Sequence, residues 1–356
     1  MPRITSLNSP LLSDLCRDLS TRSGQWQSVT DWPATSLKQC ANAGVFRWFF
    51  PEPVGGLGWD PADKTRGYLK LSEADLTTTF IITQYMGCIR RIAGSDNDAV
   101  RERWLDSLIS GQNYGTVGIS HLTTSRRHLS KPILNAVADG EGFRLNGFSP
   151  WVTGAPHADV YVIGATLDDG REMLVAVPSD LPGVEPSAGA DLLALSASCT
   201  DRVDFHDVRV EPSMLVAGPM QNVMTSGTGG TAGGLQTSTL ALGLATAAVN
   251  YLQSESEKRA DLVAAATGLG NELTQATEQL IRATSGDKTC DSAEIRAQAN
   301  GLVMRTTQAA MTAAKGAGFV EGHPVGRWCR QALFFLVWSC PQPVAQAQLC
   351  ELAGID

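Results

Sequence analysis

The chain has 356 residues, of which 43% are hydrophobic, and its formal net charge is −8. This length is enough for two or three packed units around sizeable cores. The acidic balance and the lack of any run of Lys or Arg argue against a nucleic-acid partner. No apolar stretch reaches the length that a membrane-spanning helix needs, so we expect no membrane partner.

The spacing of the cysteines and the composition of the first residues predict a cytoplasmic location. No two of the cysteines have CxxC spacing and no His lies in a zinc-like pattern, so the sequence predicts neither a metal site nor a redox dithiol. Residues 1–4 are not followed by an apolar run, so we expect no secretion signal, reduced thiols and a cytoplasmic location. The eight cysteines stand at positions 16, 40, 88, 199, 290, 329, 340 and 350.

Residues 1–114 have the pattern of a helical block. Apolar residues recur at helix spacing over residues 11–19 and again over residues 69–81. Residues 98–108 (DAVRERWLDSL) form an amphipathic pattern that predicts a helix ending near Gly111. The turn-rich residues 51–58 (PEPVGGLG) separate two of these predicted helices.

Residues 115–220 have the pattern of a sheet. Short segments alternate or run apolar, and turns such as Asp139-Gly140 and Asp169-Gly170 separate them. The predicted strands cover residues 143–145, 159–164, 173–177 and 202–210.

A Gly- and Thr-rich segment, residues 221–236, lies between the predicted sheet and the rest of the chain. It lacks the Lys-Ser/Thr ending of a phosphate-binding loop, so we interpret it as a linker. Residues 237–282 and 292–338 are Ala-rich and predict helices. The polar residues 285–288 divide these two segments.

One segment in the predicted sheet carries a specific resemblance. Residues 146–155 (NGFSPWVTGA) place an aromatic residue and a Thr after a Gly-bearing turn, and an alternating apolar strand follows at 158–163. This pattern resembles the flavin-facing strand of the acyl-CoA dehydrogenase superfamily.

Four further segments match that family in the same order. Residues 45–58 end in PEPVGGLG, and residues 100–111 resemble the helix that precedes the family's first flavin strand. Residues 198–212 (SCTDRVDFHDVRVEP) and 315–330 (KGAGF, then Pro324 and Arg330) are similar to two later motifs. The resemblance covers essentially the whole chain.

The resemblance implies an α+β fold of acyl-CoA dehydrogenase type. It assigns residues 1–114 to an N-terminal helical domain and 115–220 to a middle β-barrel. Residues 221–236 are then a Gly-rich linker, and residues 237–356 a C-terminal four-helix bundle. The family forms dimers and tetramers through this bundle, so we expect a homodimer or homotetramer.

The resemblance also implies FAD as the cofactor. Trp151 would pack against the isoalloxazine ring, with Val152 beside it, and Thr153 would form a hydrogen bond near the reactive flavin nitrogen. The resemblance also implies a strand at residues 118–121 that binds the pyrimidine edge, where Ser120 or His121 would supply a hydrogen bond. His121 would also act in catalysis, as an acid or as a group that stabilises a flavin anion.

Three residues of the C-terminal block match positions at the other end of the cofactor. Arg259 aligns with the family's Arg that reaches the flavin pyrophosphate across a subunit interface. Thr312 and Gly316 match positions near the adenosine end.

The chain departs from the family at the catalytic base. Where the family has a Glu that removes the α proton, this chain has Ser339, followed by Cys340 and Pro341. The location used in some family branches, residues 233–235, holds two Gly and a Leu. A serine without a partner cannot accept a proton from a carbon acid at neutral pH. The usual "Glu-Pro-x-x-Gly-Ser-Asp" run is also replaced, by residues 122–128.

Three functions therefore stay open from the sequence. The first is a flavoprotein oxidoreductase that acts on an acyl thioester, on CoA or on a carrier protein, with altered chemistry. The second is a flavin-dependent monooxygenase of the same fold, which needs no carbon base. The third is a non-catalytic scaffold or binding subunit that has lost the base.

Overall fold

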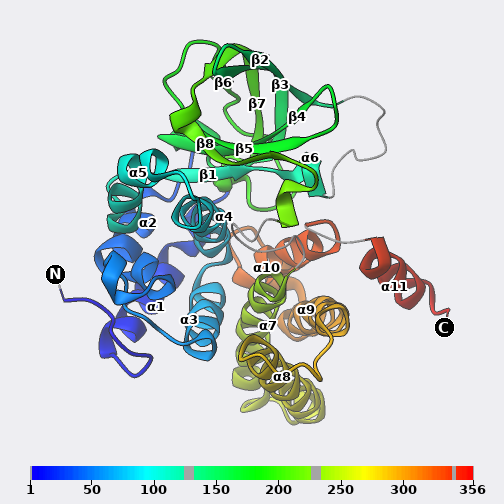
Figure 1. The fold of residues 1–356 in the computed structure, drawn as a ribbon. Helices are drawn as coiled ribbons and strands as arrows, with labels where there is room; N and C mark the ends of the chain where they lie inside the picture. The colour runs from blue at the N-terminus through cyan, green and yellow to red at the C-terminus, as the bar shows by residue number, and fades with distance from the viewer. Residues whose placement is uncertain (1, 124–131, 226–233, 339–341, 356) are drawn as a thin grey trace.

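A single sheet divides the chain into a helical part that precedes it and a helical part that follows it (Figure 1). The computed structural model describes residues 2–123, 132–225, 234–338 and 342–355. This order of helices, sheet and helices confirms the predicted fold class.

The N-terminal helices have recognisable boundaries. Asp60, Asp75 and Asn97 each accept a backbone N–H at the start of a helix, and Gly111 ends α5 with a left-handed φ of 73°. The predicted helix at residues 98–108 is confirmed as α5. The five helices are α1 (Pro10–Arg22), α2 (Ala34–Asn42), α3 (Pro61–Ala74), α4 (Leu76–Ala93) and α5 (Asp98–Ser110).

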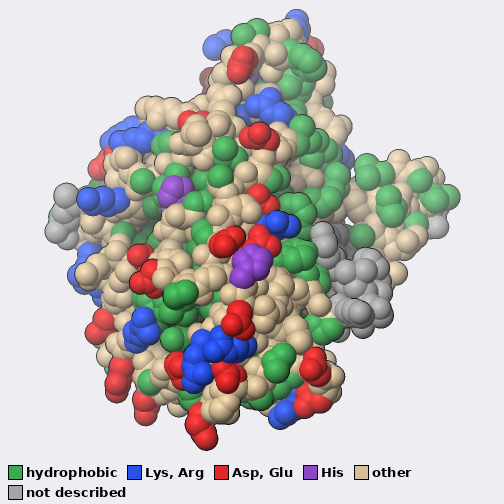
Figure 2. Space-filling model, turned by 90° about the horizontal axis from the view of Figure 1, so that it is seen from above, with side chains coloured by type: hydrophobic (Ala, Val, Ile, Leu, Met, Phe, Trp, Pro, Cys, Tyr) green, Lys and Arg blue, Asp and Glu red, His purple; other side chains and the backbone are tan. Residues whose placement is uncertain are grey.

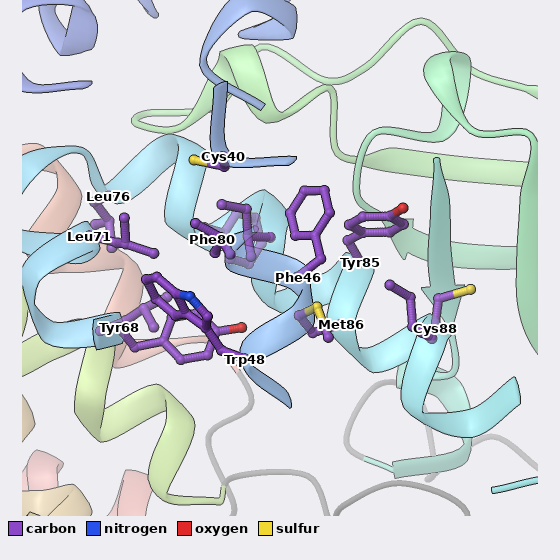
Figure 3. Packing of buried hydrophobic residues seen from close by; sticks show 14 of the residues in the cluster. Cys40, Phe46, Trp48, Tyr68, Leu71, Leu76, Phe80, Tyr85, Met86 and Cys88 are labelled. Carbon is purple, nitrogen blue, oxygen red and sulfur yellow. The ribbon is translucent and has the colours of Figure 1, made fainter. Parts of the chain in front are cut away.

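Helix α4 runs through the centre of the N-terminal core and is buried along most of its length. Phe46 meets Tyr85 of α4 edge to face, with ring centroids 4.7 Å apart. Trp48 stacks on Trp59 at 4.3 Å. Figure 3 shows the aromatic side chains of this core around α4. Phe80 of α4 also meets Phe334 edge to face at 4.9 Å, so aromatic contacts join α4 both to the N-terminal core and to the C-terminal part of the chain.

The sheet has eight strands in the order β6-β7-β3-β2-β4-β5-β8, and β1 pairs with β4 in parallel. The segments expected to be strands lie in β3, β4, β5 and β7. The strands are β1 (Gly115–Gly118), β2 (Leu134–Asp139), β3 (Gly142–Val152), β4 (Val160–Leu167), β5 (Glu172–Pro178), β6 (Val184–Pro186), β7 (Asp201–Val210) and β8 (Leu215–Met220).

The expectation of a strand over residues 118–121 is wrong beyond Gly118. Ser120–Thr123 form the short helix α6 instead. The backbone N–H of Leu122 bonds to the carbonyl of Ile119, so the chain turns out of the sheet at this point.

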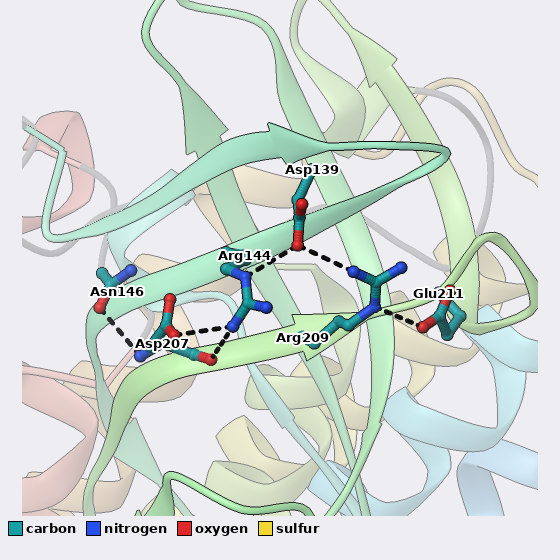
Figure 4. Close-up of polar contacts among 6 residues, drawn as sticks. All are labelled: Asp139, Arg144, Asn146, Asp207, Arg209 and Glu211. Atoms are coloured by element: carbon teal, nitrogen blue, oxygen red, sulfur yellow. Dashed lines mark hydrogen bonds and ion pairs between the residues drawn. The ribbon is translucent and has the colours of Figure 1, made fainter.

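Ion pairs hold the outer face of β2, β3 and β7 in register (Figure 4). Asp139 accepts from Arg144 at 2.8 Å and from Arg209 at 2.9 Å, and Arg144 also reaches Asp207 at 2.7 Å. These groups are partly exposed, so each pair stabilises the fold by less than about 1 kcal/mol.

The C-terminal helices pack against α3 and α4. Within the described part of the chain, no helix is long and apolar enough to cross a membrane. Figure 2 shows α11 as a lobe apart from the body, and its apolar Leu349 and Leu352 are more than half exposed. The helices are α7 (Leu235–Ser256), α8 (Val263–Thr284), α9 (Ser292–Ala314), α10 (Pro324–Leu333) and α11 (Gln342–Ala353).

Gly243 is the point of closest approach between α7 and α3. A Cβ at Gly243 would lie 2.5 Å from the Cβ of Ser72 and 2.8 Å from the carbonyl oxygen of Leu69. We expect Gly243→Ala to lower the free energy of unfolding by about 1–3 kcal/mol, because the helices must move apart. Denaturant unfolding measures this change.

Gly268 of α8 is the matched control, since nothing lies within 4 Å of its Cβ position. Gly268→Ala should raise stability by about 0.5–1 kcal/mol through helix propensity. Equal effects of the two substitutions would contradict close packing at Gly243.

Candidate active site

A cavity of about 870 Å³ lies where the sheet meets the two helical parts of the chain. Its described wall comes from α4, from the ends of β1 and β3, from residues 192–195 and from the start of α7. The end of α10 and residues 334–338 close the other side. The wall is mostly apolar with a few polar groups, which is typical of a small-molecule site.

A bulge in β3 directs Trp151 into this cavity. Ser149 pairs with Val203 of β7 and Val152 pairs with Asp201, so β3 has one more residue than β7 between these pairs. Pro150 lies within this bulge. Trp151 has a left-handed φ of 56°. This local strain turns the indole out of the sheet, so that 56% of the residue is exposed and it lines the cavity. Val152 returns to the buried core of the sheet.

Thr153 presents a hydroxyl group that its neighbours orient. Thr200 donates to the Thr153 oxygen at 3.0 Å, and the hydroxyls of Thr200 and Ser198 lie 2.7 Å apart. Because Thr200 donates to Thr153, Ser198 must donate to Thr200. The proton of Thr153 is then left for an acceptor in the cavity, which both Thr153 and Thr200 line.

Ser120 and His121 have different surroundings. Ser120 lines the cavity and donates to the carbonyl of Pro150 at 3.0 Å. His121 is buried outside the described wall, and its Nε2 lies 2.8 Å from the carbonyl of Gly164. Burial lowers the pKa of His121 to about 4, so the ring is neutral at pH 7. A cofactor or catalytic role for His121 stays a prediction.

Arg259, Thr312 and Gly316 gather at a second place, near the end of α9. Arg259 donates to the carbonyl of Ala313 at 2.6 Å and lies 3.3 Å from Asp261. Thr312 and Gly316 are exposed there. None of the three lines the cavity of its own chain, and their expected contact with the cofactor stays a prediction.

Ser339, the position expected to hold the base, lies outside the described residues. The residues just before it do form the cavity wall: Trp338 stacks on Phe334, with ring centroids 5.1 Å apart. The described wall contains no Asp or Glu. It therefore offers no carboxylate that could act as a general base.

The sequence interpretation missed the arginines of the cavity. Arg90 and Arg91 from α4 and Arg330 from α10 all line it, as does Gln236, which accepts from Arg90 at 3.2 Å. A signal was present in the sequence, because Arg90 and Arg91 are the only charged residues of α4. Charges on a helix that is otherwise buried are costly and indicate a special site.

Comparison with known proteins finds relatives of this chain. The family model for the acyl-CoA dehydrogenase N-terminal domain matches residues 15–112. Short-chain specific acyl-CoA dehydrogenase of Bos taurus is 23% identical to this chain over an alignment of 357 residues. The alignment, gaps included, covers 90% of this chain and 84% of that protein. Residues 15–112 thus match the N-terminal domain of acyl-CoA dehydrogenases, and most of the chain is similar in sequence to a member of that family. A shorter match to isovaleryl-CoA dehydrogenase of Pongo abelii is 27% identical and covers 53% of this chain and 45% of that protein.

Several solved structures share the fold over nearly the whole chain. A glutaryl-coenzyme A dehydrogenase in complex with glutaryl-CoA has a TM-score of 0.81 at 18% identity and covers 98% of this chain and 96% of its own. A glutaryl-CoA dehydrogenase of Mycobacterium smegmatis, in complex with FADH2, has a TM-score of 0.80 at 17% identity. The match covers 97% of this chain and 94% of that chain. Dibenzothiophene monooxygenase of Paenibacillus sp. A11-2 has a TM-score of 0.78 at 15% identity. The match covers 97% of this chain and 96% of that chain.

The low pKa of His121 makes the folded state sensitive to acid. The folded state binds the proton of His121 less readily than the unfolded state does, so stability is lost as pH falls from about 6.5 toward about 4. Between pH 7 and pH 5 this linkage amounts to about 2 kcal/mol.

His121→Gln keeps an amide donor for the Gly164 carbonyl but cannot titrate. We expect this variant to lose about 2 kcal/mol less unfolding free energy than the wild type between pH 7 and pH 5. Denaturant unfolding at the two pH values measures the difference. Identical pH dependence in both proteins would contradict a buried neutral His121.

Proposed function

We propose that this chain is an FAD-dependent oxidoreductase that acts on an acyl thioester, carried by CoA or by a carrier protein. The observation that carries the proposal is the β3 bulge, which presents an indole and an oriented hydroxyl to one cavity. The similarity of the chain to acyl-CoA dehydrogenases supports it.

The residues of the cavity fit a flavin. Trp151 offers an apolar aromatic face beside the open space, and Thr153 offers a hydroxyl proton that no other described group accepts. Ser120 lies on the same wall. An aromatic surface with a few hydrogen-bond donors is what a planar heteroaromatic cofactor needs.

Each of these residues has a distinct part in the proposed reaction. FAD, when bound, supplies the acceptor for the hydride that leaves the β carbon. Trp151 positions the ring, and Thr153 donates a hydrogen bond whose direction Thr200 and Ser198 fix. The apolar residues 334–338 exclude water from the thioester.

In the proposed reaction the α proton is not removed by a Glu at the family's position, because this chain has Ser339 there. Removal of the α proton needs a base within hydrogen-bond reach, and the described wall has no carboxylate. This same observation favours a second candidate, a flavin-dependent monooxygenase, which needs no such base. The likeness to dibenzothiophene monooxygenase supports the second candidate at the level of the fold.

We also propose that the chain acts as a homodimer or homotetramer in the cytoplasm. Arg259, Thr312 and Gly316 lie outside the cavity of their own chain but near exposed apolar residues. Phe319, for example, is 88% exposed. This arrangement supports a contact of these residues with the cofactor of a second copy.

The first experiment is an absorption spectrum of the purified protein, followed by titration with FAD and anaerobic addition of a panel of acyl thioesters. We expect saturable flavin uptake and bleaching by at least one thioester. Uptake without bleaching, but with oxygen-dependent product from reduced flavin, would favour the monooxygenase. A protein that refuses flavin would be a scaffold.

Thr153→Val tests the oriented hydroxyl, since valine keeps the shape and removes the donor. We expect the dissociation constant for FAD to rise about fivefold, which corresponds to one hydrogen bond of about 1 kcal/mol. Thr153→Ser should restore the affinity. Thr246→Val is the control, because the Thr246 hydroxyl donates to Leu242 within α7, away from the cavity. An unchanged affinity in Thr153→Val would contradict the role of this hydroxyl.

A further inference from the structure

Residues 334–338, which close one side of the cavity, follow α10 in a tight turn. A 3-10 turn begins at Phe334, and the N–H groups of Val337 and Trp338 both bond to the Phe334 carbonyl, at 3.1 and 2.9 Å. The carbonyls of Phe335 and Trp338 lie at the end of this helical segment, where carbonyl groups have no partner within the helix. Their partners come from another part of the chain.

Two buried side chains of α9 bind these carbonyls. Nη2 of Arg296 donates to the carbonyl of Trp338 at 2.8 Å and to that of Phe335 at 3.3 Å. Nδ2 of Asn300 donates to the carbonyl of Phe335 at 3.1 Å. Arg296 and Asn300 are one helical turn apart, so they lie on one face of α9, and they are 1% and 0% exposed. One helix face thus holds a backbone segment that lies 35 to 42 positions farther along the chain.

The guanidinium group of Arg296 suits this place. Burial of a charge costs free energy unless neighbouring groups compensate it. The carbonyls at the end of a helical segment carry partial negative charge, so they favour a cation there. Arg296 therefore fixes the two carbonyls in a way that an apolar residue could not.

The segment that Arg296 holds carries the aromatic side of the cavity. Phe334 and Trp338 line the cavity and stack on each other, with ring centroids 5.1 Å apart. Both rings meet Phe80 of α4 edge to face, at 4.9 and 5.0 Å. Neither Arg296 nor Asn300 lines the described wall, so their effect on the cavity passes through the backbone that they hold.

We propose that Arg296 is a positioning residue of the cavity, with Asn300 in support. It fixes the carbonyls of Phe335 and Trp338 and so sets the place of the aromatic wall against which the acyl group packs. The inference deepens the proposed function and rests on it for the identity of the ligand. A shift of this wall would change the fit of the acyl group and leave the proposed flavin contacts at the end of β3 in place.

Amide hydrogen exchange tests the position of the wall and needs no flavin. Arg296→Met keeps the length of the side chain and removes its donors. We expect exchange in peptides that cover residues 334–338 to become about tenfold faster or more, because the turn opens once the carbonyls lose their partner. Arg296→Lys keeps the charge and should restore part of the protection. Asn300→Ala, the milder variant, should give a smaller change at the same place.

Ligand binding tests what the wall does. Flavin-loaded protein is titrated anaerobically with butyryl-CoA and with octanoyl-CoA while the flavin spectrum is followed, and the affinity for FAD is measured separately. For a thioester that the wild type binds, we expect Arg296→Met to raise the dissociation constant about tenfold. The dissociation constant for FAD should change by less than about twofold. Arg296→Lys should recover part of the thioester affinity.

Two controls separate positioning from a general loss of stability. Arg305→Met alters the same helix at a partly exposed position, where Arg305 pairs with Glu272. Val208→Ala weakens the core of the sheet, away from the described wall. Neither control should change the exchange of residues 334–338 or the affinity for the thioester.

The outcomes separate this inference from the proposed function. Unchanged exchange at residues 334–338 in Arg296→Met, or exchange that rises equally throughout the chain, would overturn the inference whatever the protein binds. Unchanged thioester affinity, or an equal loss of FAD and thioester affinity, would overturn it while the oxidoreductase stands. In a protein that refuses FAD the proposed function fails, and a local rise in exchange still supports Arg296 as the residue that positions the wall. If Arg296→Met does not fold, Arg296→Lys and Asn300→Ala decide by the same comparisons.

Discussion

The candidate site depends on one break in the regularity of β3. In a regular strand, successive side chains point to opposite faces, so Trp151 and Thr153 would share one face and Val152 the other. The extra residue at the bulge and the left-handed backbone of Trp151 change the direction of the chain at this point. The indole is thereby exposed to the cavity, Val152 stays in the core of the sheet, and the Thr153 hydroxyl meets Thr200.

The helices complete the site around this strand. Helix α4 is buried in the N-terminal core, and its position against β1 brings Gly87 and Arg90 to the cavity wall. Gly87 lies beside Val117 of β1, whose nearest methyl carbon is 3.5 Å from the Cβ position of Gly87. Close packing of α7 on α3 at Gly243 then places Gln236, one residue into α7, within reach of Arg90. The same packing that stabilises the fold therefore positions the charged part of the cavity.

The sequence predicted the parts of this structure that depend on local patterns. The order of helical, sheet and helical segments and the helix that ends at Gly111 follow from periodicity and turn residues. The Trp151-Val152 end of β3, with Thr153 directly after it, follows from its motif. The resemblance to the family wrongly predicted a strand at Ser120 and His121. The turn into α6 depends on a hydrogen bond from Leu122 to Ile119, and so short a segment has no periodicity that would indicate it. Local patterns could not predict contacts between segments that are distant in the sequence. Thr153 and Thr200 are 47 positions apart, and Arg90 and Gln236 are 146 positions apart.

The most direct measurement of this account is a crystal structure of the protein soaked with FAD. The account predicts the isoalloxazine ring in the cavity, packed against Trp151, with a ring atom within hydrogen-bond distance of the Thr153 hydroxyl. A cavity without flavin, or a flavin whose ring lies away from Trp151 and Thr153, would contradict it.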